Sequence, residues 1–173
     1  MRRLRYQVAS SLDGYIADPN GGFDWIVMDP DIDFAALFAQ FDTAVMGRKT
    51  FLATLQQGGS GAMPGLDVVV FSRTLRQADY PDVSIVDSDP VERVRSLKET
   101  PGKDIWLYGG GELFRTLLEA GLVDTVEPAV IPVLLGDGIP MLPSPAPRVT
   151  LSLSRHHLYP KSGIMLLEYT VSR

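Results

Sequence analysis

The sequence predicts an α/β fold, with a mostly parallel central sheet flanked by helices and an antiparallel C-terminal edge. Two observations support this prediction. Through the first two thirds of the chain, short apolar segments alternate with segments of helical periodicity, a pattern typical of parallel strands joined by helices. Near the C-terminus, two strand-like segments at 149–158 and 163–171 flank a Pro-containing turn, which indicates a hairpin.

The individual elements follow from local patterns. In chain order, the expected strands before the hairpin are 5–10 with a short continuation at 15–17, 43–46, 66–71, 83–86, 105–108 and 126–135. The expected helices are 31–41, one that begins near Lys49 or Thr50, 89–98 and 112–120. Apolar residues at helical spacing, from Phe34 to Phe41, predict the first helix. Pro128 and Pro132 are expected to interrupt the long strand, because proline removes a ladder hydrogen bond.

Length and composition narrow the class of protein. The 173 residues suit one domain, 1–173, and no segment reads as an interdomain linker. The net charge of −5 lacks the broad positive field that attracts nucleic acid or anionic lipid, so neither is an expected partner. The chain has no signal-peptide pattern and no apolar run approaching the roughly 20 residues of a membrane helix, which favours the cytoplasm.

Metal and thiol chemistry are not expected. The chain has no cysteine, which excludes disulfides, thiolate catalysis and cysteine-ligated zinc. His156 and His157 are its only histidines, and neighbours on a strand point to opposite faces. We therefore expect a half-buried strand pair here and no metal site.

Three strand ends carry residues suited to phosphate. The segment IWLYGGGELF at 105–114 leads through three glycines into a helix, whose free N–H groups and dipole favour an anion. MGRKT at 46–50 and FSRT at 71–74 place cations and hydroxyls after two further strands. Each segment alone also fits a plain turn, a pair of solvated cations or a polar loop. Because ligands of α/β sheets bind beyond the carboxyl ends of the strands, the three together predict a dinucleotide phosphate site.

These segments resemble a known fold. MGRKTF at 46–51, FSRT at 71–74 and YGGGELF at 108–114 look like the dihydrofolate reductase fold in order and spacing. SLDGYIAD at 11–18 and VIPVLLGDGIPML at 130–142 resemble, within it, the reductase domain of the bifunctional riboflavin-biosynthesis deaminase–reductase. The resemblance covers nearly the whole chain. It implies a dihydrofolate reductase-like fold, NADPH as cofactor, a cis peptide bond between Gly109 and Gly110, and a homodimer.

The resemblance also implies roles for single residues in cofactor binding. The residues of 48–50 would hold phosphates of the adenosine half, and those of 72–74 would surround the 2′-phosphate. Arg73 would favour NADPH over NADH. The pyrophosphate would lie against Gly110, Gly111 and the helix that they open. The full implied set is Ala9, Ala17, Gly47, Arg48, Lys49, Thr50, Ser72, Arg73, Thr74, Tyr108, Gly109, Gly110, Gly111, Glu112 and Leu113.

On the substrate side, the resemblance places the nicotinamide beside the first strand and the loop after it. The implied substrate residues are Ser11, Asp13, Gly14 and Trp25. Asp13-Gly14 also fits a plain turn, and Trp25 also fits the core. Asp31 and Asp33 occupy about the place where dihydrofolate reductases carry an acidic residue that assists proton delivery, although either also fits a helix cap.

The expected function is therefore that of an NADPH-dependent reductase. Hydride would pass to a small heterocycle, a riboflavin precursor of the 5-amino-6-ribosylaminouracil type or a related pyrimidine or pterin. Two departures leave the substrate open: the zinc deaminase half is absent, and Pro128 falls in a strand that would line the pocket. Dihydrofolate reductase proper and a non-catalytic NADP(H)-binding protein are the alternatives.

Overall fold

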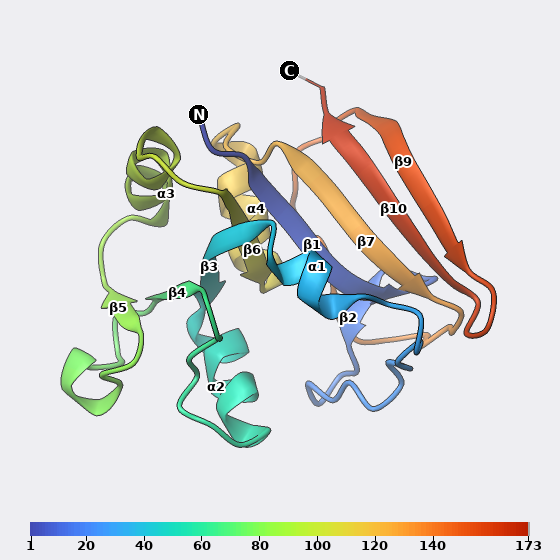
Figure 1. Cartoon of the computed structure of the whole chain (residues 1–173), viewed down its shortest axis with the longest axis horizontal. Coiled ribbons are helices and arrows are strands. Elements are labelled where there is room, and N and C mark those ends of the chain that lie inside the picture. Colours follow the sequence, from blue (N-terminus) through green and yellow to red (C-terminus); the bar gives the residue numbers. More distant parts are fainter. Residues whose placement is uncertain (173) are drawn as a thin grey trace.

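An eight-stranded sheet runs through the computed structural model, which describes residues 1–172 (Figure 1). Its strand order is β5-β4-β3-β6-β1-β7-β10-β9, and all pairs from β5 to β7 are parallel. The two C-terminal strands add in antiparallel fashion, β10 to β7 and β9 to β10. The architecture confirms the predicted mostly parallel sheet with an antiparallel edge.

The strands of this sheet have the following bounds: β1 Leu4–Ser11, β3 Phe41–Gly47, β4 Asp67–Phe71, β5 Ser84–Val86, β6 Asp104–Gly109, β7 Thr125–Ile131, β9 Leu151–Tyr159 and β10 Ile164–Val171. Two short strands, β2 (Tyr15–Ala17) and β8 (Ile139–Pro140), pair separately from it. The α-helices are α1 Phe34–Phe38, α2 Arg48–Gln56, α3 Pro90–Glu99 and α4 Gly111–Glu119, and a short 3-10 helix covers Gln77–Asp79.

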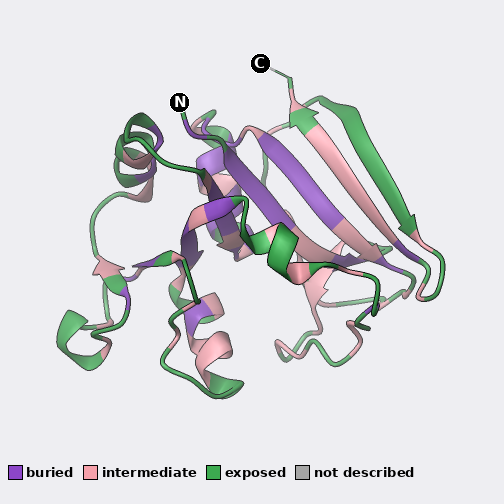
Figure 2. Cartoon of the chain, in the orientation of Figure 1, coloured by how far each residue is buried: buried purple, intermediate pink, exposed green. Residues whose placement is uncertain are grey.

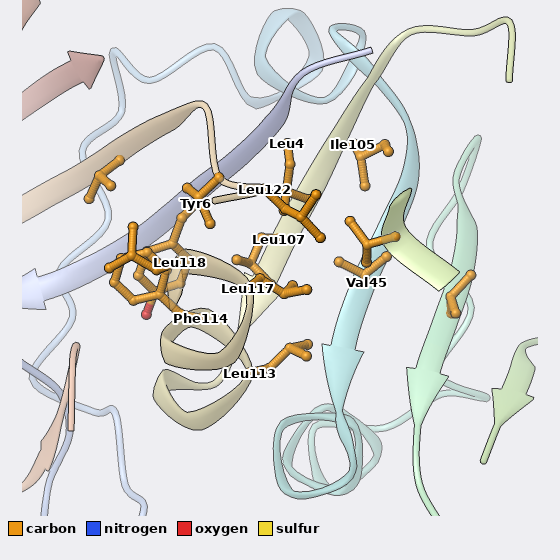
Figure 3. Close-up of a cluster of buried hydrophobic side chains, with 14 residues drawn as sticks. Leu4, Tyr6, Val45, Ile105, Leu107, Leu113, Phe114, Leu117, Leu118 and Leu122 are labelled. Carbon is orange, nitrogen blue, oxygen red and sulfur yellow. The ribbon is translucent and has the colours of Figure 1, made fainter. Parts of the chain in front are cut away.

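Helix α4 covers one face of the sheet and forms the main core with it. Its apolar side is buried against side chains of β1, β3 and β6, as the close-up shows (Figure 3). The ring of Phe114 stacks on Tyr6 of β1, with 3.9 Å between the ring centroids. Val94 of α3 joins the same cluster, so α3 and α4 share this face.

The opposite face is covered by α1 and α2. Phe51 of α2 is buried with Met46 of β3, and Phe38 of α1 stacks on Trp106 of β6. Beyond α1, the part of the sheet formed by β10 and β9 is more open, and β9 is exposed along nearly its whole length (Figure 2). His156 and His157 lie on β9 and are both exposed, so the expectation of a half-buried pair is wrong.

The first predicted helix is much shorter than expected. The side chain of Asp33 accepts a hydrogen bond from Ala36 N (2.9 Å) and caps α1 there, so the predicted 31–41 shrinks to Phe34–Phe38. Phe41 belongs to β3 instead, where its ring stacks on Trp106. The helical spacing of the phenylalanines therefore does not mark one helix. Phe38 of α1 and Phe41 of β3 instead pack on the same indole, that of Trp106.

Pro128 and Pro132 have different effects on the long predicted strand. Pro128 lies inside β7 and keeps its place opposite Val8 of β1. The pairing of β7 with β10 omits Pro128 and Glu127, so the missing N–H opens that ladder without ending the strand. β7 ends at Ile131, directly before Pro132, and not at 135 as expected.

An ion pair between Arg5 and Glu127 is buried in the middle of the sheet, on the face that α1 partly covers. Arg5 of β1 and Glu127 of β7 are only 4% and 2% exposed. Their side chains form a bidentate pair, with Nε–Oε1 at 2.7 Å and Nη2–Oε2 at 2.8 Å. Thr125 Oγ1 and Gln7 Nε2 donate to the same carboxylate at 2.6 and 3.2 Å. Four donors thus hold the Glu127 carboxylate in one position.

Removing this carboxylate is expected to destabilise the protein strongly. Glu127→Gln leaves the guanidinium of Arg5 buried without its main counter-charge, so we expect a loss of about 3 kcal/mol in the free energy of unfolding. Glu92→Gln, which removes an exposed pair with Arg95, is the control, with an expected loss below about 0.5 kcal/mol. Urea unfolding of both variants measures the difference, and equal losses would contradict the prediction.

Candidate functional site

The candidate site lies at the edge of the sheet where the parallel strands end. Strands β1, β3, β4 and β6 all terminate at this edge because they run in the same direction. Met46 is opposite Gly109, and Gly47 is opposite Phe71, so the three predicted segments follow neighbouring positions of the sheet. The tertiary structure therefore brings the phosphate-suited segments together.

The start of α2 meets the glycine segment directly. A Cβ atom placed on Gly110 would lie 3.2 Å from Thr50 Oγ1, and one on Gly109 would lie 3.7 Å from it. The peptide bond between Gly109 and Gly110 is cis, as the resemblance implies. The hydroxyl of Thr50 thus lies beside the glycine backbone where α4 begins.

The two helices at this edge begin without a side-chain cap. Gly47 and Gly110 are the N-cap residues of α2 and α4, and neither helix has a capping side chain. By contrast, Asp33 and Asp89 cap α1 and α3. The first-turn N–H groups of α2 and α4 are therefore free of side-chain partners, as a helix N-terminus that binds an anion requires.

Three cations follow the ends of β3 and β4 at this edge. Arg48, Lys49 and Arg73 are exposed, and none of them forms an ion pair with any residue of 1–172. The chain as a whole carries a net charge of −5, so this edge is a local exception. Unpaired guanidinium and ammonium groups next to open helix N-termini are suited to phosphate groups.

The serine of the FSRT segment shapes the turn itself. Ser72 is 7% exposed, and its Oγ accepts hydrogen bonds from Thr74 N (3.2 Å) and Leu75 N (3.0 Å). Arg73 and Thr74 are exposed at the tip of this turn. Ser72 therefore positions the turn that presents its two neighbours to solvent.

The remaining residues of the glycine segment have mixed surroundings. A Cβ atom on Gly111 would lie 2.7 Å from Pro140 O and 2.9 Å from Pro143 Cδ, so only glycine fits there without movement. The side chain of Leu113 packs in the core, and Glu112 pairs with Arg115 (2.6 Å). The side chains of Leu113 and Glu112 are thus engaged elsewhere, and their backbone atoms are the groups that can contact a ligand. Tyr108 is half-buried, and burial raises the pKa of its phenol.

The predicted substrate residues at the end of β1 hold the local backbone in place. Ser11 Oγ donates to Asp13 Oδ1 (2.6 Å) and accepts from Tyr15 N (2.9 Å). Asp13 also accepts from Leu135 N (3.1 Å) and Gly136 N (2.7 Å). The Ser11 hydrogen bond and these backbone donors lower the pKa of Asp13. Together they fasten the loop after β7 to the end of β1.

Gly14 and Trp25 lie in the same region. Gly14 has φ +88°, a left-handed conformation that favours glycine, and its carbonyl accepts from Met141 N (2.9 Å). Trp25 is half-buried, and its indole Nε1 donates to Gly22 O (3.2 Å). Ala9 and Ala17 are half-buried at the ends of β1 and β2, respectively.

The two acidic residues before α1 border a separate hollow. Asp33 caps α1, and Asp31 Oδ1 pairs with Lys161 Nζ at 2.8 Å. Both line a hollow of about 250 Å³ between α1 and the β9–β10 hairpin. The floor of this hollow includes Arg5, Gln7 and Glu127, which sequence reasoning missed. Two features of the sequence could have pointed to these residues. Polar residues alternate along the first strand, and Glu127 is an acidic residue in an otherwise apolar strand.

Residues 1–172 contain neither a metal-binding cluster nor a membrane-spanning helix. No group of three or more His, Asp or Glu side chains there is arranged to hold a metal ion. None of the described helices is long and apolar enough to cross a membrane.

The sheet topology is that of the dihydrofolate reductase-like fold. Residues 2–163 match the RibD C-terminal domain, so the chain belongs to that family. The uncharacterized protein YyaP of Bacillus subtilis (strain 168) is 36% identical, over 97% of this chain and 94% of YyaP. A protein of Shewanella sp. PV-4 assigned to riboflavin biosynthesis is 26% identical, with a TM-score of 0.83 and full coverage of both chains.

More distant structures support the fold. A deaminase and 5-amino-6-(5-phosphoribosylamino)uracil reductase from Thermotoga maritima is 19% identical, with a TM-score of 0.72 over 99% of this chain and 57% of that protein. Dihydrofolate reductase from Enterococcus faecalis, in complex with NADP(H), is 16% identical, with a TM-score of 0.72 over 99% of this chain and 97% of the reductase.

The packing at Gly111 gives a test of the site geometry. Gly111→Ala forces the start of α4 away from the 140–143 loop, and we expect a loss of about 1–3 kcal/mol in the free energy of unfolding from overpacking. Gly47→Ala is the matched control, because a Cβ atom there has nothing within 4 Å. Urea unfolding of both variants measures the effect. A Gly111→Ala protein as stable as Gly47→Ala would contradict this close packing at Gly111.

Proposed function

We propose that the protein is an NADPH-dependent reductase that transfers hydride to a small heterocycle. The substrate class is a riboflavin precursor of the 5-amino-6-ribosylaminouracil type, or a related pyrimidine or pterin. The observation that carries the proposal is the junction of two uncapped helix N-termini with three unpaired cations at the end of the parallel strands. Membership of the RibD C-terminal domain family supports an oxidoreductase, and the family's fold is shared with an NADP(H)-bound reductase.

The residues present fit the phosphate groups of NADPH. The backbone at Gly47 and Gly110 carries no side chain that would fill the space next to the helix starts. Arg48, Lys49 and Thr50 are proposed to hold phosphates of the adenosine half, and Arg73 and Thr74 to bind the 2′-phosphate. When bound, NADPH would supply the hydride.

The chain's own contribution to the reaction is binding and orientation. Ala9 and Ala17, with their small side chains, are proposed to border the nicotinamide. Ser11 and Asp13 are proposed to act by fixing the loop that encloses the substrate, because their polar atoms are engaged in it. Asp31 and Asp33 are proposed as the acidic residues that assist proton delivery from the rim of the hollow. We place the protein in the cytoplasm, as one domain over 1–173.

A homodimer is proposed on the basis of the exposed sheet edge. The outer side of β9 pairs with no strand of residues 1–172, and Leu151, Leu153 and Leu158 are 39%, 52% and 50% exposed. Long exposed edge strands are a liability unless they are covered, which favours coverage by a second copy. Light scattering at micromolar concentration distinguishes the dimer from a monomer.

The proposed role of Arg73 predicts that the protein binds NADPH more tightly than NADH. Arg73→Gln removes a charged hydrogen bond to the 2′-phosphate, so NADPH affinity should fall about tenfold, while NADH affinity should stay within about twofold. Arg76→Gln is the control, because Arg76 is an exposed neighbour that already pairs with Asp79. Fluorescence titration of both variants with both cofactors measures this. An equal loss for NADPH and NADH would remove the assigned role of Arg73.

Substrate turnover separates the proposed activity from its alternatives. We expect NADPH oxidation with 5-amino-6-(5-phosphoribosylamino)uracil or its dephosphorylated form to exceed that with dihydrofolate. Efficient turnover of dihydrofolate alone would identify a dihydrofolate reductase instead. NADPH binding without turnover of either substrate would identify a non-catalytic NADP(H)-binding protein. The loss of NADPH absorbance under saturating cofactor is the measurement.

A further inference from the structure

The hollow between α1 and the β9–β10 hairpin has a polar floor that the proposed cofactor site does not use. Gln7 and Glu127 are paired neighbours on β1 and β7, and both face this hollow. Gln7 is 8% exposed, so more than nine tenths of it is buried. The hollow of about 250 Å³ is large enough for a small ring with its substituents.

The orientation of the Gln7 amide is set by its neighbours. Gln7 Nε2 donates to Glu127 Oε2 at 3.2 Å. The carboxylate of Glu127 accepts hydrogen bonds and donates none while Arg5 pairs with it in bidentate fashion. Turning the amide over would place Gln7 Oε1 against that carboxylate, with two acceptors facing each other. Gln7 Oε1 is therefore held on the side away from Glu127.

This oxygen has no hydrogen-bond partner among residues 1–172, although it is buried. The other polar atoms around it are satisfied: Glu127 has four donors, and Trp106 Nε1 donates to Gln7 O at 3.0 Å. A buried acceptor without a donor is rare in folded proteins, and a water molecule, an ion or a ligand can satisfy it. Because Gln7 lines the hollow, this fixed and unsatisfied acceptor belongs to its floor, where neighbouring atoms cover it.

The position of Gln7 relates it to the proposed hydride site. Gln7 and Ala9 are two residues apart on β1, so their side chains share one face, separated by roughly 7 Å along the strand. Ala9 is the residue proposed to border the nicotinamide. A pyrimidine-sized ring above Ala9 can extend toward Gln7 and present a ring N–H to it.

We propose that Gln7 Oε1 is a specificity-determining acceptor, which selects heterocycles that carry a ring N–H of the uracil type. The inference rests on the proposed function and names the edge of the substrate that the protein reads. The buried Arg5–Glu127 pair has a positioning role, because it holds the Gln7 amide in the one orientation that offers the oxygen. Heterocycles with a methylated nitrogen at that edge would leave the buried oxygen unpaired and would be rejected.

A pair of small pyrimidines tests the proposal directly. The probes are 5,6-diaminouracil, which has two ring N–H groups, and its 1,3-dimethyl derivative, which has none. We expect the wild-type protein to bind the first at least about tenfold more tightly, as one hydrogen bond of this kind allows. Gln7→Met should weaken binding of 5,6-diaminouracil alone and bring the ratio to within about twofold. Isothermal titration calorimetry measures all four affinities.

Gln40→Met is the matched control. Gln40 lines the same hollow, and its Oε1 accepts from Arg5 Nη1 (2.8 Å), so this change loosens the charged network and leaves the Gln7 amide in place. The control should keep the wild-type preference. A preference that persists in Gln7→Met, or that disappears equally in Gln40→Met, would overturn the role of Gln7.

The test of Gln7 and the test of the proposed reductase function can fail independently of each other. The wild-type comparison of the two pyrimidines does not depend on any variant that fails to fold, and equal binding of both probes, or of neither, overturns the proposal. NADPH titrations of the wild-type and Gln7→Met proteins should give the same affinity. If NADPH does not bind the wild-type protein, the reductase proposal fails, while the pyrimidine preference is still measured without cofactor.

Discussion

The parallel pairing of β1, β3, β4 and β6 is the constraint on which the rest of the molecule depends. Parallel strands that share one direction end at one edge, and every connection between them must cross a face of the sheet. The crossing helices α2 and α4 therefore start at that same edge. Their uncapped N-termini, the cis Gly109–Gly110 bond and the unpaired cations meet there as a consequence of strand direction.

The two faces of the sheet serve different purposes. The face under α4 is apolar and closely packed, with Tyr6 and Phe114 stacked at its centre. The other face carries the buried pair of Arg5 and Glu127, whose desolvation offsets much of its attraction. A chain selected for stability alone would fill this position with apolar residues. The pair is more readily understood as a support that orients Gln7 beside the hollow.

The sheet offers two kinds of polar groups to a ligand: backbone groups at the edge where the parallel strands end, and side chains in the hollow beside α1. At the proposed cofactor edge, backbone N–H groups and glycines border the helix starts, and side chains add charge at the rim. In the hollow between α1 and the β9–β10 hairpin, side chains form the floor. At the end of β1, Ser11 and Asp13 fasten the loop after β7.

The sequence alone determined the fold class, the approximate positions of the strands of the main sheet and the three phosphate-suited segments, because hydrophobic period and glycine placement are local properties. It did not determine where β7 ends. The Asp33 cap could be foreseen as one of two possibilities. The length of α1 could not, because Phe41 joins β3 and packs with Phe38 on Trp106 only in three dimensions. Gln7 and Glu127 lie 120 residues apart. Only the parallel register of β1 and β7 places them opposite each other and turns a glutamine of a buried strand into a fixed acceptor.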